Sequence, residues 1–278
     1  MNYISLDEFI LSALNEDIGT GDITTNSCIP ENAKSEGRFI AKDDGVFCGM
    51  DVLKRVFYLV DQSVTVTPMV KDGDQVKNGD TIALISGPSR SILSGERLAL
   101  NLVQHMSGIA SATSKAVKAV EGTHARITDT RKTTPGLRVL EKYAVKAGGG
   151  SNHRFNLADG VLIKDNHIAA ASGITAAVNM TRANIPHTLK IEVETETMDQ
   201  VKEALDAGAD IIMLDNMTNE LMTQAVKYID GRAMTEASGN MGERDLLAVA
   251  QTGVDIISIG SLTHTVKALD ISLKFAKA

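Results

Sequence analysis

The chain of 278 residues contains no tryptophan and only two cysteines, and aromatic residues make up 4% of it. Cys28 and Cys48 lack the CxxC spacing of redox and zinc motifs, and the histidines near them do not complete a zinc ligand set. A fold held together by disulfides or by structural zinc is therefore excluded. Two isolated thiols are typical of a protein in a reducing cytoplasm, so we expect a cytoplasmic location.

Long apolar runs are also missing from the sequence. Acidic residues interrupt the apolar positions near the N-terminus, at Asp7, Glu8, Glu16 and Asp17. We therefore expect neither a signal peptide nor a membrane-spanning helix there. The apolar residues, 43% of the chain, occur in short runs between clusters of glycine, aspartate and asparagine, which is typical of a globular protein.

The chain has no excess of positive charge, since its formal net charge is -7, and this argues against nucleic acid as a partner. The charge is nevertheless uneven. Between Arg126 and His167, eight Lys or Arg residues outnumber four acidic residues, a local charge of +4 that leaves -11 for the rest. Such a basic segment favours a concave site for a small anion, because a cleft concentrates the field of its lining charges. A solvated helix face would have the same composition.

The second part of the sequence has the pattern of repeated βα units. After about residue 122, short apolar runs alternate with amphipathic segments, and helices are predicted over Met198–Ala207 and Asn219–Ile229. Six units are fewer than the eight of a closed barrel, so we predict an α/β fold with an incomplete, open barrel. A doubly wound open sheet is the alternative. The predicted strands are Ala125–Asp129, Gly160–Ile163, Leu189–Val193, Asp210–Leu214, Arg232–Thr235 and Val254–Ile259.

The first part of the sequence predicts a separate N-terminal α+β domain over residues 1–107, followed by the barrel domain over residues 108–265. Acidic helical material precedes short strand-like runs, and Gly95–Val120 predicts a long helix that connects the two parts. A C-terminal helix is predicted within residues 266–278, and it could pack on either domain. Turns are expected at Asp72-Gly73, Asn78-Gly79 and Gly87-Pro88.

Polar or small residues follow every one of the six predicted strands. Because α/β barrels place their active sites at the carboxyl ends of the strands, these residues are candidates for one shared site. Each has a simpler explanation by itself, such as a helix N-cap for Asp215 or a surface charge for Glu194. The candidates are Arg131 with Lys132, Lys164, Glu194, Asp215, Ser238 with Gly239, and Gly260.

Four cations would gather in one half of this site, namely Arg131, Lys132, Arg154 and Lys164. Two cations about 6 Å apart repel each other by about 2.8 kcal/mol at an effective dielectric constant of about 20. A ligand with several negative charges relieves this repulsion, and Arg binds carboxylate or phosphate through two parallel hydrogen bonds. The expected ligand is therefore polyanionic.

The other half of the predicted site suits a sugar phosphate. Glu194 and Asp215 offer carboxylates for a divalent metal, for ribose hydroxyls or for positive charge on a sugar carbon. Backbone N–H groups for a phosphate are expected at the last two strand ends, in Ser238-Gly239-Asn240 and Ile259-Gly260-Ser261.

The segment from Asp129 to Ile168, DTRKTTPGLRVLEKYAVKAGGGSNHRFNLADGVLIKDNHI, resembles the quinolinate phosphoribosyltransferases. This resemblance implies an enzyme of NAD biosynthesis that joins quinolinate to phosphoribosyl pyrophosphate and forms nicotinate mononucleotide, pyrophosphate and carbon dioxide. It also implies an incomplete barrel with an N-terminal α/β domain, and a homodimer or hexamer. Further matching segments are EDIGTGDIT, GERLALNLVQHMSGIA (95–110), EVE (192–194), MLDN (213–216), EASGN (236–240) and GVDIISIGSLTH (253–264).

The resemblance also implies roles for individual residues. Lys132, Glu194 and Asp215 form the expected catalytic set: Lys132 holds pyrophosphate or the ribosyl phosphates, and the two acids contact ribose and Mg²⁺, directly or through water. Arg97 is expected to enter the site of a neighbouring subunit. Thr130 is expected to belong to the residues that bind substrate. No organic cofactor is expected. The residues expected to bind the quinolinate carboxylates are Arg131, His153, Arg154 and Lys164. Those expected to bind the 5'-phosphate are Ser238, Gly239, Asn240, Ile259, Gly260 and Ser261.

Two other functions are compatible with parts of this pattern. One is a related transferase or accessory protein of the same fold, including relatives linked to molybdate transport, against which the complete basic set argues. The other is a catalytically silent protein that senses a pyridine or a phosphosugar. The presence of both Glu194 and Asp215 argues against this second alternative.

Overall fold

Apolar side chains collect in two separate cores in the computed structural model, which describes residues 3–276. Each core belongs to its own unit of the chain. The first unit contains residues 3–114, 135–149 and 266–276, and the second contains residues 115–134 and 150–265. Within the described residues, no helix has both the length and the apolar character needed to cross a bilayer.

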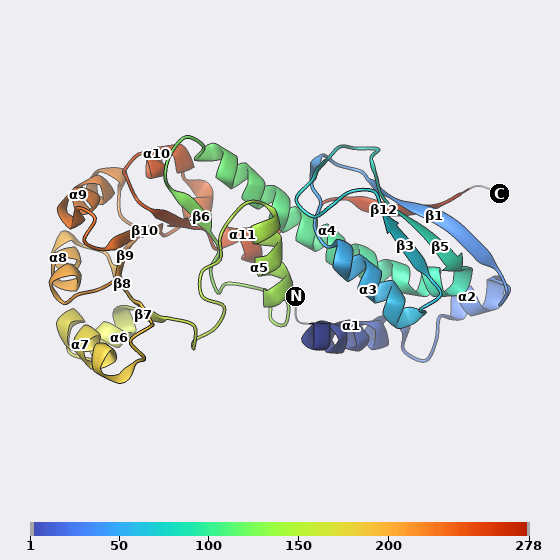
Figure 1. Ribbon diagram of the computed structural model, residues 1–278, viewed down its shortest axis with the longest axis horizontal. Helices are drawn as coiled ribbons and strands as arrows, with labels where there is room; N and C mark the ends of the chain where they lie inside the picture. The colour runs from blue at the N-terminus through green and yellow to red at the C-terminus, as the bar shows by residue number, and fades with distance from the viewer. Residues whose placement is uncertain (1–2, 277–278) are drawn as a thin grey trace. The chain divides into compact units, whose positions relative to one another are not determined.

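The first unit is built on an antiparallel sheet with the strand order β12-β1-β5-β3 (Figure 1). Its strands are β1 (Lys34–Ala41), β3 (Thr65–Pro68), β5 (Thr81–Pro88) and β12 (Ile271–Phe275). A short separate pair consists of β2 (Gly45–Val46) and β4 (Gln75–Val76). The helices are α1 (Tyr3–Ile18), α2 (Ile23–Cys28), α3 (Met50–Val60), α4 (Ser89–Ala119) and α5 (Arg138–Ala147). The last five residues of α4 belong to the second unit.

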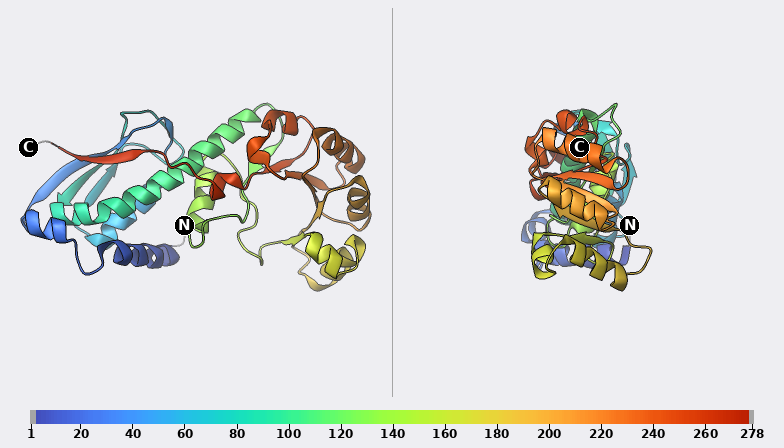
Figure 2. Two further views of the ribbon diagram at one scale, coloured as in Figure 1. Left: turned by 180° about the vertical axis from the view of Figure 1, so that it is seen from behind. Right: turned by 90° about the vertical axis from the view of Figure 1, so that its left-hand side faces the viewer.

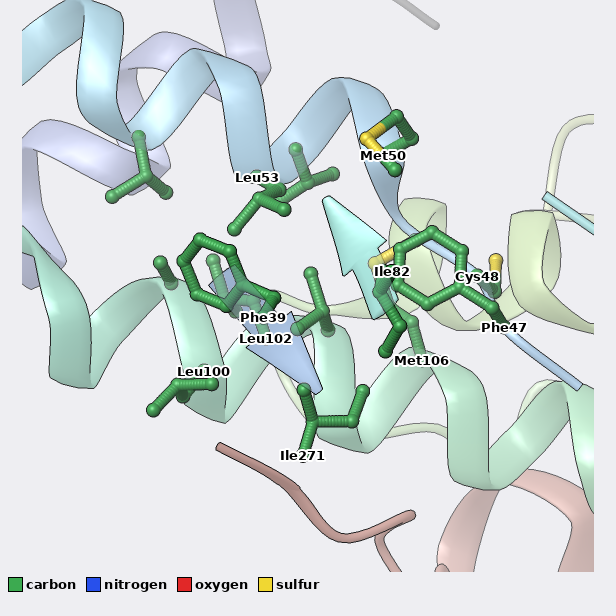
Figure 3. Packing of buried hydrophobic residues seen from close by; sticks show 14 of the residues in the cluster. Phe39, Phe47, Cys48, Met50, Leu53, Ile82, Leu100, Leu102, Met106 and Ile271 are labelled. Carbon is green, nitrogen blue, oxygen red and sulfur yellow. The ribbon is translucent and has the colours of Figure 1, made fainter. Parts of the chain in front are cut away.

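The core of the first unit lies where α3 and α4 meet the sheet. Phe39 of β1 and Ile82 of β5 are fully buried, and their side chains lie among those of Leu53 and Met106 from the two helices (Figure 3). The ring of Phe39 also packs at a tilt against Phe57, with 6.1 Å between ring centroids. This packing fixes α4, the long helix that the sequence predicts.

The C-terminal helix predicted within residues 266–278 is wrong, because Ile271–Phe275 form strand β12. This strand pairs antiparallel with β1, and Ile271 lies opposite Ala41. Ile271 and Leu273 are buried while Lys274 is exposed, so burial alternates along the strand. The edge of β1 supplies backbone partners for this segment, and that long-range pairing overrides the local helical pattern.

One of the three predicted turns is also wrong. Gly73 and Gly79 adopt φ angles of 93° and 98°, so the turns at Asp72-Gly73 and Asn78-Gly79 are confirmed. Gly87-Pro88 instead completes strand β5, and Gly87 pairs with Ser35 of β1. A Cβ atom on Gly87 would lie 3.0 Å from the Cα atom of Val64, so glycine is needed here for close packing of backbone.

The second unit contains a parallel sheet of six strands in the order β6-β11-β10-β9-β8-β7, and all six predicted strands are confirmed. The strands are β6 (Arg126–Thr128), β7 (Val161–Ile163), β8 (Ile191–Thr195), β9 (Ile211–Asp215), β10 (Met234–Ser238) and β11 (Ile256–Ser258). Between them lie α6 (Asp165–Ala170), α7 (Ile174–Asn184), α8 (Met198–Asp206), α9 (Asn219–Ile229), the 3-10 turn η1 (Met241–Glu243) and α10 (Leu246–Ala250), and α11 (Ser261–His264) follows β11.

The strand order of the second unit is that of a barrel opened between its first two strands. The strands follow one another around the sheet, and β6 returns to pair with β11. Among the described residues, no strand ladder joins β6 to β7. Helices α7, α8 and α9 lie on the outer side of the curved sheet (Figures 1 and 2). The incomplete barrel is therefore confirmed, and the doubly wound sheet, which needs helices on both faces, is excluded.

Alternate residues of each barrel strand have different surroundings. In β8, Ile191 and Val193 belong to the apolar core between the strands and the helices. Glu192 and Glu194 alternate with them and so point to the opposite face, the barrel interior. The barrel thus has an apolar outer layer and a polar interior.

Candidate active site

A pocket of about 400 Å³ lies at the carboxyl ends of the barrel strands. Residues two positions apart on a strand both line the pocket, because every second side chain of a strand points inward. Pairs of lining residues two positions apart are Leu162 and Lys164, Met213 and Asp215, Glu236 and Ser238, and Ser258 and Gly260. All lining residues belong to the second unit.

Most of the predicted site residues line the pocket. Two predicted residues, Ile259 and Arg97, do not. Ile259 has its side chain in the apolar core, while its backbone N–H donates to the Thr128 carbonyl at 2.9 Å. Arg97 is exposed on α4 in the first unit. The predicted residues that line the pocket are Thr130, Arg131, Lys132, His153, Arg154, Lys164, Glu194, Asp215, Ser238, Gly239, Asn240, Gly260 and Ser261.

Arg131 and Arg154 provide half-buried positive charge in the pocket. Burial lowers the pKa of Arg154, and the neighbouring charge of Arg131 lowers it further, while Glu192 acts in the opposite direction. The guanidinium of Arg154 is held in place because its Nη1 donates to the Gly160 carbonyl at 2.7 Å. Because Arg131 disfavours the charged form of Arg154, an anionic ligand between the two arginines is favoured.

Lys164, Glu194 and Asp215 connect the cationic half of the pocket with its acidic half. The Nζ atom of Lys164 lies 3.3 Å from an Oε2 of Glu194. Burial raises the pKa of Glu194, and the charge of Asp215 raises it as well, while Lys164 opposes both effects. Both oxygens of Asp215 accept hydrogen bonds, one from the Ser238 hydroxyl and one from the Asn216 amide at 2.7 Å. Asp215 is thereby held in one orientation.

Lys132 lies where the first and last barrel strands meet. Its backbone N–H donates to Thr130 Oγ1 at 3.0 Å, and its carbonyl accepts from Thr263 Oγ1 at 2.8 Å. A Cβ atom on Gly260 would lie 3.0 Å from the Lys132 side chain, so glycine leaves room for that side chain. Gly239 has a φ angle of 90°, and a Cβ atom there would collide with Asn216. The backbone is thus left accessible on this side of the pocket.

His153 and Glu236 line the pocket, and Glu192 lies beside them to complete an acidic cluster. Nε2 of His153 is 3.1 Å from Oε2 of Glu192 and 3.7 Å from Oε1 of Glu236. The other ring nitrogen, Nδ1, accepts the backbone N–H of Arg154 at 2.8 Å. Burial raises the pKa of Glu236 to about 8, the charge of Glu192 adds to this effect, and His153 opposes it.

Two domain models match the chain. The model of the quinolinate phosphoribosyl transferase N-terminal domain matches residues 22–107, and the model of its C-terminal domain matches residues 109–274. The chain belongs to the quinolinate phosphoribosyltransferase family. A probable nicotinate-nucleotide pyrophosphorylase (carboxylating) of Bacillus subtilis is 47% identical, with 98% of this chain and 94% of the relative covered. A mitochondrial quinolinate phosphoribosyltransferase (decarboxylating) of Nicotiana tabacum is 42% identical, with 97% and 82% covered.

A solved structure of the family has the same fold. It is the nicotinate-nucleotide pyrophosphorylase of Francisella tularensis, which is 38% identical to this chain, with a TM-score of 0.95 and coverage of 99% of this chain and 98% of the other. The family membership predicted from the segments around residues 129–168 and 236–264 is therefore confirmed, as is the fold class.

Glu192 and Glu236 are the site residues of this family member that the sequence reasoning missed. The search took polar residues that follow each apolar run. Glu192 lies inside the predicted strand Leu189–Val193. Glu236 directly follows the predicted strand Arg232–Thr235, but Ser238 and Gly239 were chosen there instead. The signal was the two-residue period of a strand, since Glu192 stands two positions before Glu194 and Glu236 two positions before Ser238. Glu236 lines the pocket, and the other lining residues without a prediction are Leu162, Met213, Asn216, Met241, Gly242, Glu243, Ser258 and His264.

Glu236 is expected to make the stability of this family member depend on pH. Its pKa is raised from 4.5 to about 8, so between these values the folded chain holds a proton that the unfolded chain has lost. This proton on Glu236 contributes fully to the free energy of unfolding below the unfolded-state pKa of 4.5. The contribution is lost as the pH rises through the folded-state pKa of about 8. Glu236→Gln should therefore flatten the decline of the unfolding free energy across this window, as measured by urea denaturation. The exposed control Glu121→Gln should keep the wild-type slope, and an equal slope in both variants would contradict the assignment.

Proposed function

We propose that this chain transfers the phosphoribosyl group of phosphoribosyl pyrophosphate to quinolinate, with release of pyrophosphate and carbon dioxide, and forms nicotinate mononucleotide for NAD biosynthesis. The observation that carries this proposal is one pocket that places Arg131, Arg154 and Lys164 beside Glu194 and Asp215. The names of the relatives, which include quinolinate phosphoribosyltransferase (decarboxylating), support the reaction and its carboxyl chemistry.

The cationic half of the pocket is the proposed site for quinolinate. Arg131, Arg154 and Lys164 bind its two carboxylates, since guanidinium groups offer paired donors and an ammonium group offers a third cation. His153 reaches the same half of the pocket, and its ring nitrogens contact Glu192 and the backbone of Arg154. The phosphate of the second substrate is assigned to residues 238–240 and to Gly260 and Ser261, which line the pocket. The backbone N–H of Ile259 is already bonded to Thr128 and is not part of this assignment.

In the proposed reaction, the pyridine nitrogen attacks C1 of the ribose while the bond from C1 to pyrophosphate breaks. Lys132 offers positive charge to the departing pyrophosphate, and Glu194 and Asp215 hold the ribose and offset positive charge on C1. The new pyridinium nitrogen then accepts electron density when the C2 carboxylate leaves as carbon dioxide, and a proton takes its place at C2. The protein chiefly positions its substrates, an effect that can supply about 7–11 kcal/mol of the barrier.

Mg²⁺ is the proposed metal of this site, held by Glu194 and Asp215 directly or through water. The donor set fits, because both side chains offer hard carboxylate oxygens at the same mouth of the barrel, and the raised pKa of Glu194 indicates that added positive charge there would stabilise its ionised form. When bound, the metal supplies positive charge for the pyrophosphate oxygens. No organic cofactor is proposed, since the alkylated pyridine itself accepts the electron pair.

We further propose a homodimer or hexamer in which Arg97 completes the site of a neighbouring subunit. Arg97 is exposed on α4, although the residues around it on that helix, such as Leu98 and Leu100, are buried. An exposed guanidinium at this position is available to a phosphate or carboxylate of another copy. A cytoplasmic location is proposed as well, and it is supported by the two free thiols, Cys28 and Cys48.

The assay that tests the function combines purified protein, Mg²⁺, phosphoribosyl pyrophosphate and quinolinate. We expect stoichiometric nicotinate mononucleotide, pyrophosphate and carbon dioxide, measured by chromatography and a coupled pyrophosphate assay. Nicotinate is the matched control substrate, and it should give no product because it lacks the second carboxylate. Product from nicotinate would favour a related transferase, and ligand binding without product would favour a silent binding protein.

Arg131→Ala and Lys164→Ala should each raise the KM for quinolinate by about 10- to 150-fold, because a charged hydrogen bond to a carboxylate contributes roughly 1.5–3 kcal/mol. Steady-state kinetics measure this, and circular dichroism should show an unchanged fold. Lys202→Ala is the control, because Lys202 forms only an exposed ion pair with Asp199. Wild-type kinetics in either pocket variant would sink the assignment.

Mixing two inactive variants tests the shared site. Arg97→Ala and Lys132→Ala proteins should each have little activity, since each removes one part of every site. If Arg97 acts in the neighbouring subunit, random exchange of subunits in a dimer restores one intact site in half of the dimers, about a quarter of all sites. Activity should therefore return after mixed refolding, to about that fraction of wild type. No recovery despite confirmed subunit exchange would show that Arg97 does not act in the site of the neighbouring subunit.

A further inference from the structure

The acidic cluster beside the pocket consists of His153, Glu192 and Glu236, of which His153 and Glu236 line the pocket. The two glutamates are 3% and 2% exposed, and within residues 3–276 the Oε1 atom of each is buried without a hydrogen-bond partner. Glu236 nevertheless lines the pocket, so its carboxyl group lies between the protein interior and the substrate. A buried carboxylate with an unsatisfied oxygen is costly unless the group is neutral or faces a compensating charge.

The groups that face Glu236 come from several elements. Glu192 of β8 and Asp129 after β6 contribute negative charge, His153 approaches from the loop before β7, and Ser258 of β11 offers a hydroxyl. The cations Arg131 and Arg154 line the same pocket, and Glu192 favours the charged form of Arg154. Burial and the charge of Glu192 outweigh the opposing effects of His153 and Ser258, so the neutral form of Glu236 is favoured.

The ring of His153 is oriented by contacts at both of its nitrogens. Its Nδ1 accepts the backbone N–H of Arg154, so the ring proton is on Nε2, which points to Glu192 at 3.1 Å. The imidazole therefore donates to Glu192, whereas Oε1 of Glu236 is farther from the same nitrogen, at 3.7 Å. Glu192 has this donor and Arg154 near it, while Oε1 of Glu236 has no hydrogen-bond partner within residues 3–276.

We propose that Glu236 is a positioning residue that remains protonated beside an ionised Glu192, so that a single negative charge faces the dicarboxylate substrate. This inference rests on the proposed function, since it assumes that the pocket binds quinolinate. A second charge in the cluster would repel both carboxylates of the substrate and would compete with them for Arg131 and Arg154. The neutral form of Glu236 preserves the net positive charge of the binding site.

The proposal predicts that quinolinate binding weakens at alkaline pH. Glu236 loses its proton as the pH rises through about 8, whereas the carboxylates of quinolinate remain ionised throughout. The added charge should raise the Kd and the KM for quinolinate roughly tenfold, the effect of about 1.4 kcal/mol of repulsion. We would measure Kd by isothermal titration calorimetry and KM by steady-state kinetics, from about pH 6 to about pH 10.

Two variants give opposite changes in this profile. Glu236→Gln keeps the shape of the side chain but cannot ionise, so the alkaline weakening should disappear. Glu192→Gln removes the charge that holds the proton on Glu236, so the weakening should move to lower pH. Glu121→Gln, on the exposed turn after α4, is the matched control and should keep the wild-type profile. A role in packing alone would change affinity at every pH and would not move the profile in these two directions.

The outcomes separate this inference from the proposed function. If wild-type protein converts quinolinate but its Kd does not change with pH, or if Glu236→Gln keeps the alkaline weakening, the inference is overturned and the function stands. If quinolinate is neither bound nor converted at any pH, the proposed function itself fails. Should Glu236→Gln not fold, an unshifted profile in Glu192→Gln overturns the inference equally.

A divalent metal in the cluster is the competing explanation, because its three potential ligand atoms lie within 4.8 Å of one another. Binding of quinolinate without turnover can be measured after exhaustive treatment with a chelator. An alkaline weakening that persists in metal-free protein supports the shared negative charge. Its loss on chelation, with recovery on addition of Zn²⁺ or Mn²⁺, overturns the proposal in favour of a metal site.

Discussion

The strict alternation of side chains on six parallel strands is the constraint on which the rest of the second unit depends. Each strand must direct apolar residues outward, where Val193, Ile212 and Ala237 pack against the helices. The intervening residues then point inward whether or not they are apolar. Because the barrel is open between β6 and β7 and its interior is lined by Glu, Asp, Ser and Met, this inner face forms a polar pocket.

Balance of charge is the second requirement that this architecture imposes. Arg131, Arg154 and Lys164 repel each other in an empty pocket, and the acids that share the interior reduce that repulsion. Lys164 pairs with Glu194, and Glu192 favours the charged form of Arg154. The site can therefore be assembled before the substrate arrives and still retain the positive charge that a dianion needs. Such preorganisation is what allows positioning to contribute to the reaction rate.

Much of the site could be predicted because each strand is followed by its functional residue along the chain. Lys164, Glu194 and Asp215 were accessible to that reasoning, since a polar residue after an apolar run is visible in the sequence. Glu192 and Glu236 were not recognised, because a single acid within a predicted strand or directly after it is usually an exposed residue of a sheet with one solvated face. Only the curvature of the sheet, which buries its inner face around a pocket, makes these two acids part of the site.

The sequence alone determined the helices and strands of the barrel, the family, and the residues at the strand ends, because periodicity and short motifs are local properties of the chain. The tertiary structure decided the features that depend on contacts between distant segments. Ile271–Phe275 became a strand because β1 offered an unpaired edge, and Gly87 continued β5 because Val64 packs directly against it. Glu236 likewise keeps its proton because folding removes it from water and brings Glu192 beside it, and neither effect exists before the strands assemble.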